Sequence, residues 1–237
     1  MRDAPAPTPV SDARPVVSDE KFKFITKVGV EFEGGWISRP SFTVHSDGSV
    51  SCDGEIRGES HTDPVDNMKS LFDEIKAKYP DIVNQSCGMH VHISLPELYY
   101  TFLTTSKFWE YFCTKMPAVI EMLKSSKKTV DYERFNSRFM GGNTYCKKEF
   151  RPHNQIWETH KGSDRYTMLN FCYGLHHTME CRLFPMCESI SNARLIITEY
   201  LHIVESFLAE HKETITYRID VDVPEDPESG KEEVCVS

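Results

Sequence analysis

Three segments far apart in the chain alternate apolar residues with charged or ionisable ones, and this period of two constrains the fold more than any other feature. They are GVEFE at 29–33, MHVHI at 89–93 and TMECRL at 178–183. Successive side chains of a strand point to opposite faces, so each segment predicts a strand with one apolar face. The same alternation at 22–24 and 215–221 predicts two more strands.

Helices are expected between these strands. Apolar residues recur at three- and four-residue spacing over 63–79, 106–128 and 191–211. Pro117 predicts a kink or a division of the second segment into two helices. Asp47-Gly48 predicts a tight hairpin turn. Because strands and helices do not alternate regularly, the sequence favours an α+β fold, with an antiparallel or mixed sheet and helices on one face.

Composition and charge restrict the domain plan and the partners. Of the 237 residues, 1–20 are proline-rich and 224–237 are acidic, so we expect a disordered arm, a folded domain over 21–223 and a disordered tail. With 27 Lys and Arg against 36 Asp and Glu, the net charge of −9 disfavours a nucleic-acid partner. No apolar run approaches the roughly 20 residues that span a bilayer. We therefore expect a cytoplasmic protein without a membrane partner.

The polar positions of the three alternating segments suggest a functional site. In each segment two ionisable residues stand at i and i+2, on one face of the predicted strand. The three pairs are Glu31 and Glu33, His90 and His92, and Glu180 and Arg182. For one pair alone, an ordinary solvated strand face would be the better explanation. Three pairs of residue types that bind cations and phosphates favour a site on the face opposite the helices.

A divalent metal is the simplest way to hold several carboxylates close together, because neighbouring carboxylates repel and raise each other's pKa. Oxygen-rich ligation by Glu31, Glu33 and Glu180, joined by Glu59, favours Mg²⁺ or Mn²⁺, with His90 as a nitrogen ligand. The chain contains no HExxH zinc motif.

Two arginines could bind an anionic group beside this metal. Arg182 stands two residues from Glu180, and Arg165 precedes Tyr166. A guanidinium suits bidentate contact with phosphate or carboxylate. For Arg182 the alternative is a salt bridge to Glu180 or Glu199. The chain has neither a GxxxxGK[ST] nor a GxGxxG motif, which excludes a P-loop or Rossmann nucleotide site.

The motifs GVEFE, DGS, GES, CGMHVHIS, RYTMLN and TMECRLFP follow one another across residues 29–185. In this order they resemble the amidoligase family, a branch of the carboxylate-amine ligases related to glutamine synthetase and glutamate–cysteine ligase. The resemblance implies a glutamine synthetase-like curved sheet. Helices would pack on its convex face, and ATP with Mg²⁺ would bind on its concave face.

The resemblance also implies roles for individual residues. Metal ligands would be Glu31, Glu33, Glu59, His90 and Glu180. The nucleotide would contact His90, His92, Arg165 and Arg182. Catalysis would involve Glu59, Arg165 and Arg182, with Glu59 or Asp47 as the general base.

The implied reaction transfers the γ-phosphoryl group of ATP to a substrate carboxylate. An amine then attacks the acyl phosphate and forms an amide. The substrates would be small-molecule or peptide carboxylates and amines. Sites of the glutamine synthetase type can be completed by a neighbouring subunit, so a homo-oligomer is a further expectation.

Two other functions stay open on the sequence. A metal-dependent hydrolase using His90 and His92 predicts zinc in the purified protein and turnover without nucleotide. A binding module without catalytic activity would recognise a nucleotide or an acidic peptide.

Overall fold

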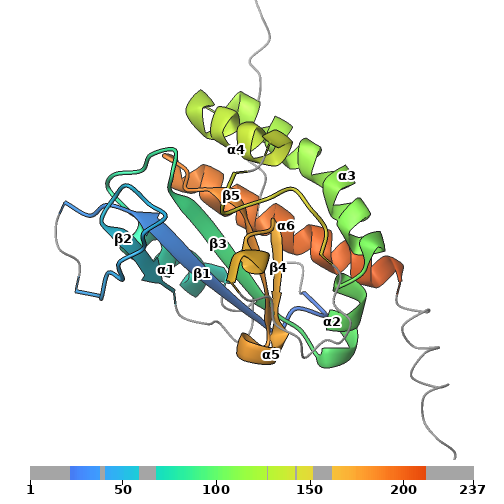
Figure 1. Ribbon diagram of the computed structural model, residues 1–237. Helices are drawn as coiled ribbons and strands as arrows, with labels where there is room; N and C mark the ends of the chain where they lie inside the picture. The colour runs from blue at the N-terminus through green and yellow to red at the C-terminus, as the bar shows by residue number, and fades with distance from the viewer. Residues whose placement is uncertain are drawn as a thin grey trace, which may run out of the picture.

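The computed structural model describes residues 22–37, 41–58, 68–126, 128–141, 143–151 and 162–211, which form a mixed α+β fold (Figure 1). Their sheet is open and antiparallel, with five strands in the order β2-β1-β3-β5-β4. The strands are β1 (Lys27–Gly34), β2 (Gly54–Arg57), β3 (Gly88–Ser94), β4 (Leu169–Cys172) and β5 (Thr178–Pro185). The expectation of an α+β fold is confirmed at this level.

Six α-helices and two short 3₁₀ helices complete the described part of the chain. The α-helices are α1 (Met68–Lys78), α2 (Glu97–Leu103), α3 (Ser106–Met122), α4 (Thr129–Gly141), α5 (Tyr173–His176) and α6 (Ile190–Glu210). The 3₁₀ helices are η1 (Leu123–Ser125) and η2 (Gly162–Arg165).

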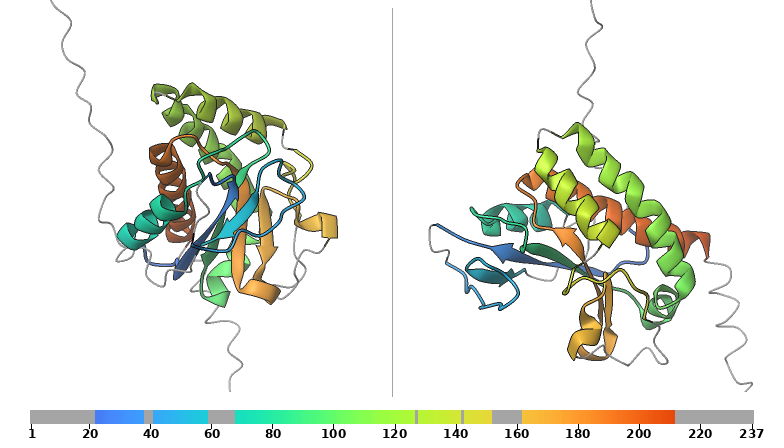
Figure 2. Two further views of the ribbon diagram at one scale, coloured as in Figure 1. Left: turned by 90° about the vertical axis from the view of Figure 1, so that its left-hand side faces the viewer. Right: turned by 45° about the horizontal axis from the view of Figure 1, so that its top comes forward.

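Alternating side chains of the three central strands form the sheet side of the core. Each strand buries three apolar residues at every second position: Val28, Val30 and Phe32 on β1, Met89, Val91 and Ile93 on β3, and Met179, Cys181 and Leu183 on β5. Helices α1 and α6 cover this face, and segment 41–53 lies on the other side of the sheet (Figure 2, left). The period of two therefore separates an apolar face from a polar one.

Helices α3, α4 and α6 enclose one end of the sheet. The rings of Phe184 on β5 and Tyr200 on α6 lie 5.4 Å apart, and Phe135 on α4 meets Phe184 edge-on at 5.7 Å. Helix α3 continues through Pro117 to Met122, so the predicted division into two helices is wrong. Helix α6 matches the helix predicted at 191–211, and the Ser189 side chain caps its first turn.

Two local predictions are corrected by the structure. Residues 22–24 are not a strand, because the Glu205 carboxylate on α6 accepts the backbone N–H groups of Lys23, Phe24 and Ile25 at 2.8–2.9 Å. The turn at Asp47-Gly48 exists, but it closes no tight hairpin. The nearest antiparallel bridge joins His45 to Glu55, well outside the turn.

Several elements had no clear sequence signal, and some predictions lie outside the described residues. The short strands β2 and β4 and the helices α2 and α4 were not predicted. The arm 1–20, the tail 224–237, the strand at 215–221 and the helix start at 63–67 fall outside the described ranges. Within those ranges, no helix combines the length and the hydropathy that a membrane span requires.

Candidate active site

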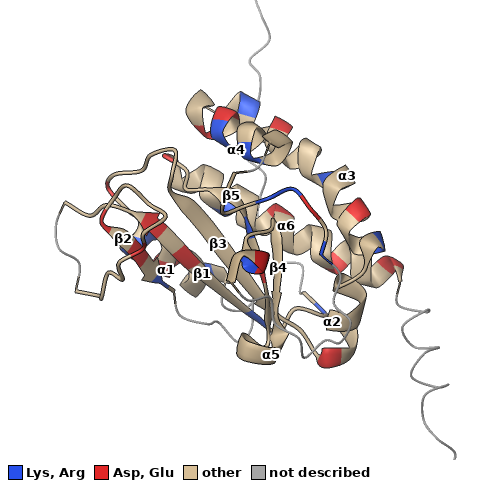
Figure 3. Ribbon diagram, viewed as in Figure 1, with Lys and Arg blue, Asp and Glu red and all other residues tan. Residues whose placement is uncertain are grey.

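The register of β1, β3 and β5 brings the predicted polar residues side by side. Glu31 on β1 is the direct partner of His90 on β3, and His92 is the direct partner of Glu180 on β5. Residues opposite each other on antiparallel strands have neighbouring side chains on one face. Figure 3 shows the acidic positions along β1 and β2.

His90 is the central residue of this surface. Its Nδ1 lies 3.3 Å from Glu31 Oε2 and 3.3 Å from Glu180 Oε1, and its Nε2 lies 3.4 Å from Glu33 Oε1. The other oxygen of Glu33 accepts the backbone N–H of Gly88. One imidazole thus contacts three carboxylates, and both Glu33 and Glu180 are almost fully buried.

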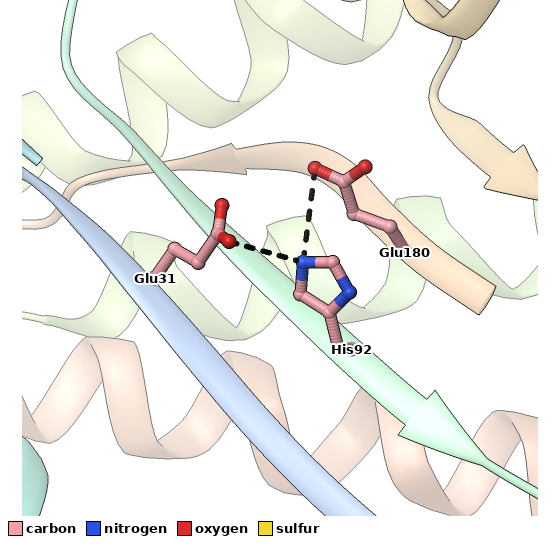
Figure 4. Close-up of side chains that lie close together, drawn as sticks. All are labelled: Glu31, His92 and Glu180. Atoms are coloured by element: carbon pink, nitrogen blue, oxygen red, sulfur yellow. Dashed lines mark ion pairs between the residues drawn. The ribbon is translucent and has the colours of Figure 1, made fainter. Parts of the chain in front are cut away.

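Glu31, His92 and Glu180 form a group that we call the first cluster (Figure 4). One donor atom from each lies within 4.8 Å of the others. His92 Nε2 is 3.6 Å from Glu31 Oε1 and 4.0 Å from Glu180 Oε1, too far for a hydrogen bond. This nitrogen is buried and has no hydrogen-bond partner among the described residues. The spacing leaves room for a cation between the three donors.

Glu33, Asp47 and Glu55 form a second cluster, also within 4.8 Å of one another. Asp47 comes from the turn before β2, where Ser49 donates its N–H and its hydroxyl to Asp47 Oδ1 at 2.7 and 2.6 Å. Glu55 is the cross-strand partner of Glu33. All donors of this cluster are oxygens.

Basic and amide side chains surround the buried Glu180. Arg182 Nη1 lies 2.5 Å from Glu180 Oε1, so the alternative of a salt bridge to Glu180 is realised. Asn170 on β4 donates to the other carboxylate oxygen at 2.6 Å. Arg138, buried on α4, donates to the carbonyls of Phe184 and Cys87 at 3.0 and 2.8 Å.

The charges of the first cluster shift the pKa of each member. Burial alone would raise the pKa of Glu31, but hydrogen bonds and charges from His90 and His92 hold it well below its usual value. Burial would likewise raise the pKa of Glu180, and Arg182 with the two imidazoles lowers it. Burial disfavours charged His92, yet contacts with Cys172 and with the carboxylates of Glu31 and Glu180 raise its pKa to about 10.

The second cluster behaves differently. Burial, reinforced by the charge of Glu31, raises the pKa of Glu55 despite its pairing with Arg57. Burial also opposes ionisation of Asp47, but its hydrogen bonds from Ser49 hold its pKa below the usual value. Asp47 is therefore a weak proton acceptor.

A small hollow of about 20 Å³ opens beside His90. Its walls include Glu33, Arg138, Tyr145 and Arg182. A volume of this size holds one water molecule or one ion and excludes a nucleotide. Two of these walls are joined, because the Tyr145 carbonyl accepts a hydrogen bond from Arg182 Nε at 3.3 Å.

The structure brings most of the predicted site residues together. Six of them gather on one face: Glu31, Glu33, His90, His92, Glu180 and Arg182. Arg165 is exposed on η2, and its guanidinium contact among the described residues is with Tyr166, at 5.1 Å from the ring centre. Glu59 lies outside the described residues.

Sequence reasoning missed three polar residues of this face: Arg138, Asn170 and Glu55. Arg138 belongs to a helix that was not predicted. Asn170 lies in the quoted segment RYTMLN, and Glu55 follows the turn at Asp47-Gly48. Their proximity to the site depends on strand order, which alternation within one segment does not reveal.

Comparisons with family models, with curated proteins and with solved structures find no match to this chain. The site is therefore interpreted from its own geometry.

Proposed function

We propose that this protein is an ATP- and Mg²⁺-dependent carboxylate-amine ligase whose site is the polar face of β1, β3 and β5. The observation that carries the proposal is the unpartnered, buried Nε2 of His92 between the carboxylates of Glu31 and Glu180. A buried polar atom without a hydrogen bond is costly in a folded protein, and a cation bound between the two carboxylates would give this nitrogen a partner.

The donors suit a divalent cation. Two carboxylates and one imidazole in the first cluster, and three carboxylates in the second, match the ligands that Mg²⁺ and Mn²⁺ take in proteins. When bound, such a cation would supply the positive charge that shields the phosphates of ATP from the substrate carboxylate. In this proposal Glu31, His92 and Glu180 hold one cation, and the second cluster is the place for another.

Arginines would neutralise the charge that develops during phosphoryl transfer. Arg182 contacts Glu180 through Nη1 and donates a hydrogen bond from Nε to the Tyr145 carbonyl. If the Tyr145 carbonyl moved away, the Nε–H of Arg182 would be free to bind a phosphate, and the hollow would become larger. In this proposal, segment 143–146 moves when the nucleotide binds. Such closing segments commonly control access to active sites.

The identity of the general base in the proposed reaction stays a prediction. Asp47 is a poor general base, because its lowered pKa makes it a weak proton acceptor. Glu59 is the remaining acid that the family resemblance places at the site. An open antiparallel sheet with helices on one face is compatible with the glutamine synthetase-like curved sheet that we propose, with ATP on the face opposite α1 and α6.

The test is ADP release from Mg²⁺ and ATP in the presence of pooled carboxylates, amino acids, polyamines and peptides. We expect the wild-type protein to release ADP only when both a carboxylate and an amine are supplied. Glu31→Gln and Arg182→Ala should each slow this release by about 10²–10³, the usual cost of removing one electrostatic group from a transition state. Lys124→Ala, which removes an exposed charge on η1, is the control.

A specific observation favours a second candidate, a metal-dependent hydrolase. The first cluster contains a nitrogen donor, and imidazole with carboxylate is a ligand set that catalytic zinc also accepts. This function predicts zinc in the purified protein and turnover of a substrate without ATP. Mg²⁺-dependent ATP binding without any turnover would instead indicate a binding module.

A further inference from the structure

The ring nitrogen of His92 that faces away from the first cluster contacts the first residue of β5. His92 Nδ1 lies 3.2 Å from Thr178 Oγ1. Thr178 is half-buried and is the cross-strand partner of Cys172 on β4. The two nitrogens of one imidazole therefore have different surroundings: Nδ1 meets a hydroxyl, and Nε2 meets two carboxylates.

The contacts of Thr178 allow a chain of hydrogen bonds that starts at His92 Nδ1. The His92 Nδ1–H can donate to Thr178 Oγ1, and the Thr178 hydroxyl can donate to Cys172 Sγ at 3.1 Å. The Cys172 thiol then donates to the Thr178 carbonyl at 3.2 Å. Every proton in this chain has an acceptor. With these directions, the proton of His92 sits on Nδ1 and the lone pair of Nε2 is left for the first cluster.

The Tyr100 side chain also contacts the backbone of Thr178. The Tyr100 hydroxyl on α2 donates to the Thr178 carbonyl at 3.3 Å, and the same hydroxyl accepts the N–H of Tyr173 at 3.2 Å. Tyr100 itself is fully buried. The backbone of Thr178 is thus held by its pairing with β4 and by the Tyr100 hydroxyl of α2.

We propose that Thr178 is a positioning residue for cation binding: its hydroxyl orients His92 so that Nε2 faces a metal ion held with Glu31 and Glu180. The inference rests on the proposed function, because it assumes a cation at the first cluster. Histidines that ligate metals usually donate their second ring N–H to a fixed acceptor, and loss of that acceptor typically lowers metal affinity about 10–100-fold.

The experiment compares Mn²⁺ binding by the full-length wild-type protein with binding by two substitutions at this position, using calorimetry at fixed pH. Thr178→Val keeps the shape but removes the acceptor of His92 Nδ1–H, and we expect Mn²⁺ affinity to fall about 10–100-fold. Thr178→Ser restores the hydroxyl and should restore affinity. Thr167→Val is the matched control, because it removes another buried threonine hydroxyl, whose partner among the described residues is the Leu169 carbonyl.

A second measurement separates positioning from simple loss of stability. In protein labelled with ¹⁵N at histidine and saturated with Mg²⁺, the wild type and Thr178→Ser should show His92 protonated on Nδ1. In Thr178→Val the Nδ1–H signal of His92 should move and broaden, because this N–H has lost its acceptor. If the wild type binds Mn²⁺ and Thr178→Val binds it equally well, the inference about Thr178 is wrong and the metal site stands. If the wild type binds no Mn²⁺ or Mg²⁺, both the metal site and this inference are overturned.

Discussion

The two acidic clusters lie on the same sheet face but balance their charge in different ways. In the first cluster, the carboxylates of Glu31 and Glu180 face His90, His92 and Arg182, and their pKa values are lowered. In the second, Glu55 pairs with Arg57, whose side chain is 62% exposed, and its pKa is raised. An exposed partner is screened by water and compensates a carboxylate weakly.

The difference indicates how stable each cluster is in the metal-free protein. The protonated imidazole of His92 and the guanidinium of Arg182 can stand in for a metal charge at the first cluster. This cluster can therefore keep its geometry in the metal-free protein. The second cluster concentrates three acids with less positive charge around them, so a cation would add more to its stability.

The largest expected loss of stability comes from a substitution that breaks the contacts of the first cluster. Glu180→Gln removes the carboxylate that pairs with Arg182 and faces both imidazoles. Loss of one partner leaves buried charges uncompensated, so the free energy of unfolding of the metal-free protein should fall by about 3–5 kcal/mol. Urea denaturation in the presence of a chelator measures this change.

Glu55→Gln is the matched substitution in the second cluster. It removes repulsion from Glu31 together with the weak pairing to Arg57, and the free energy of unfolding should stay within about 0.5 kcal/mol of the wild type. Equal losses for Glu180→Gln and Glu55→Gln would contradict the contrast between the clusters.

The pH dependence of stability gives a smaller effect, and its sign follows from the pKa of His92. That pKa rises from 6.5 to about 10 on folding. The stabilisation from charged His92 is therefore complete below pH 6.5 and is lost as the pH rises towards 10. Glu31 and Glu180, with lowered pKa values, contribute above pH 4.5 and lose that contribution as the pH falls.

Metal-free protein should thus be most stable between about pH 4.5 and 6.5 and should lose a few kcal/mol by pH 10. Thermal unfolding with a chelator across this range measures the profile. His92→Asn should remove most of the alkaline loss. A wild-type profile that is flat from pH 6.5 to 10 would show that the charged imidazole does not stabilise the first cluster.

The sequence predicted the polar residues of the three central strands better than the residues that other elements bring to the site. Alternation is a local property, so 29–33, 89–93 and 178–183 each revealed which side chains share a face. The contact of His92 with Glu180 depends on strand order and on a register shift between Met89 and Val91, which no local pattern encodes. Arg138 reaches the site from α4, a helix that was not predicted from the sequence.

Gly88→Ala should separate the two clusters at a smaller cost in stability than Glu180→Gln. A Cβ on Gly88 would lie 3.0 Å from Arg138 Nη1, 3.1 Å from Glu33 Oε2 and 3.2 Å from His90 Nε2. Because these atoms end flexible side chains, Gly88→Ala should fold. We expect it to lose about 1–2 kcal/mol of unfolding free energy through overpacking. Displacement of Glu33 should weaken the second cluster and leave the contacts of Glu31 with His92 in place.

Mn²⁺ titration of Gly88→Ala tests this separation. If the wild type binds two ions, the variant should keep the binding event at the first cluster and lose affinity in the other. Gly141→Ala is the control, since a Cβ there meets no atom of the described residues within 4 Å and the φ of Gly141 lies outside the left-handed region that favours glycine. Equal weakening of both ions by Gly88→Ala would mean that His90 couples the clusters into one site, because this imidazole contacts carboxylates of both.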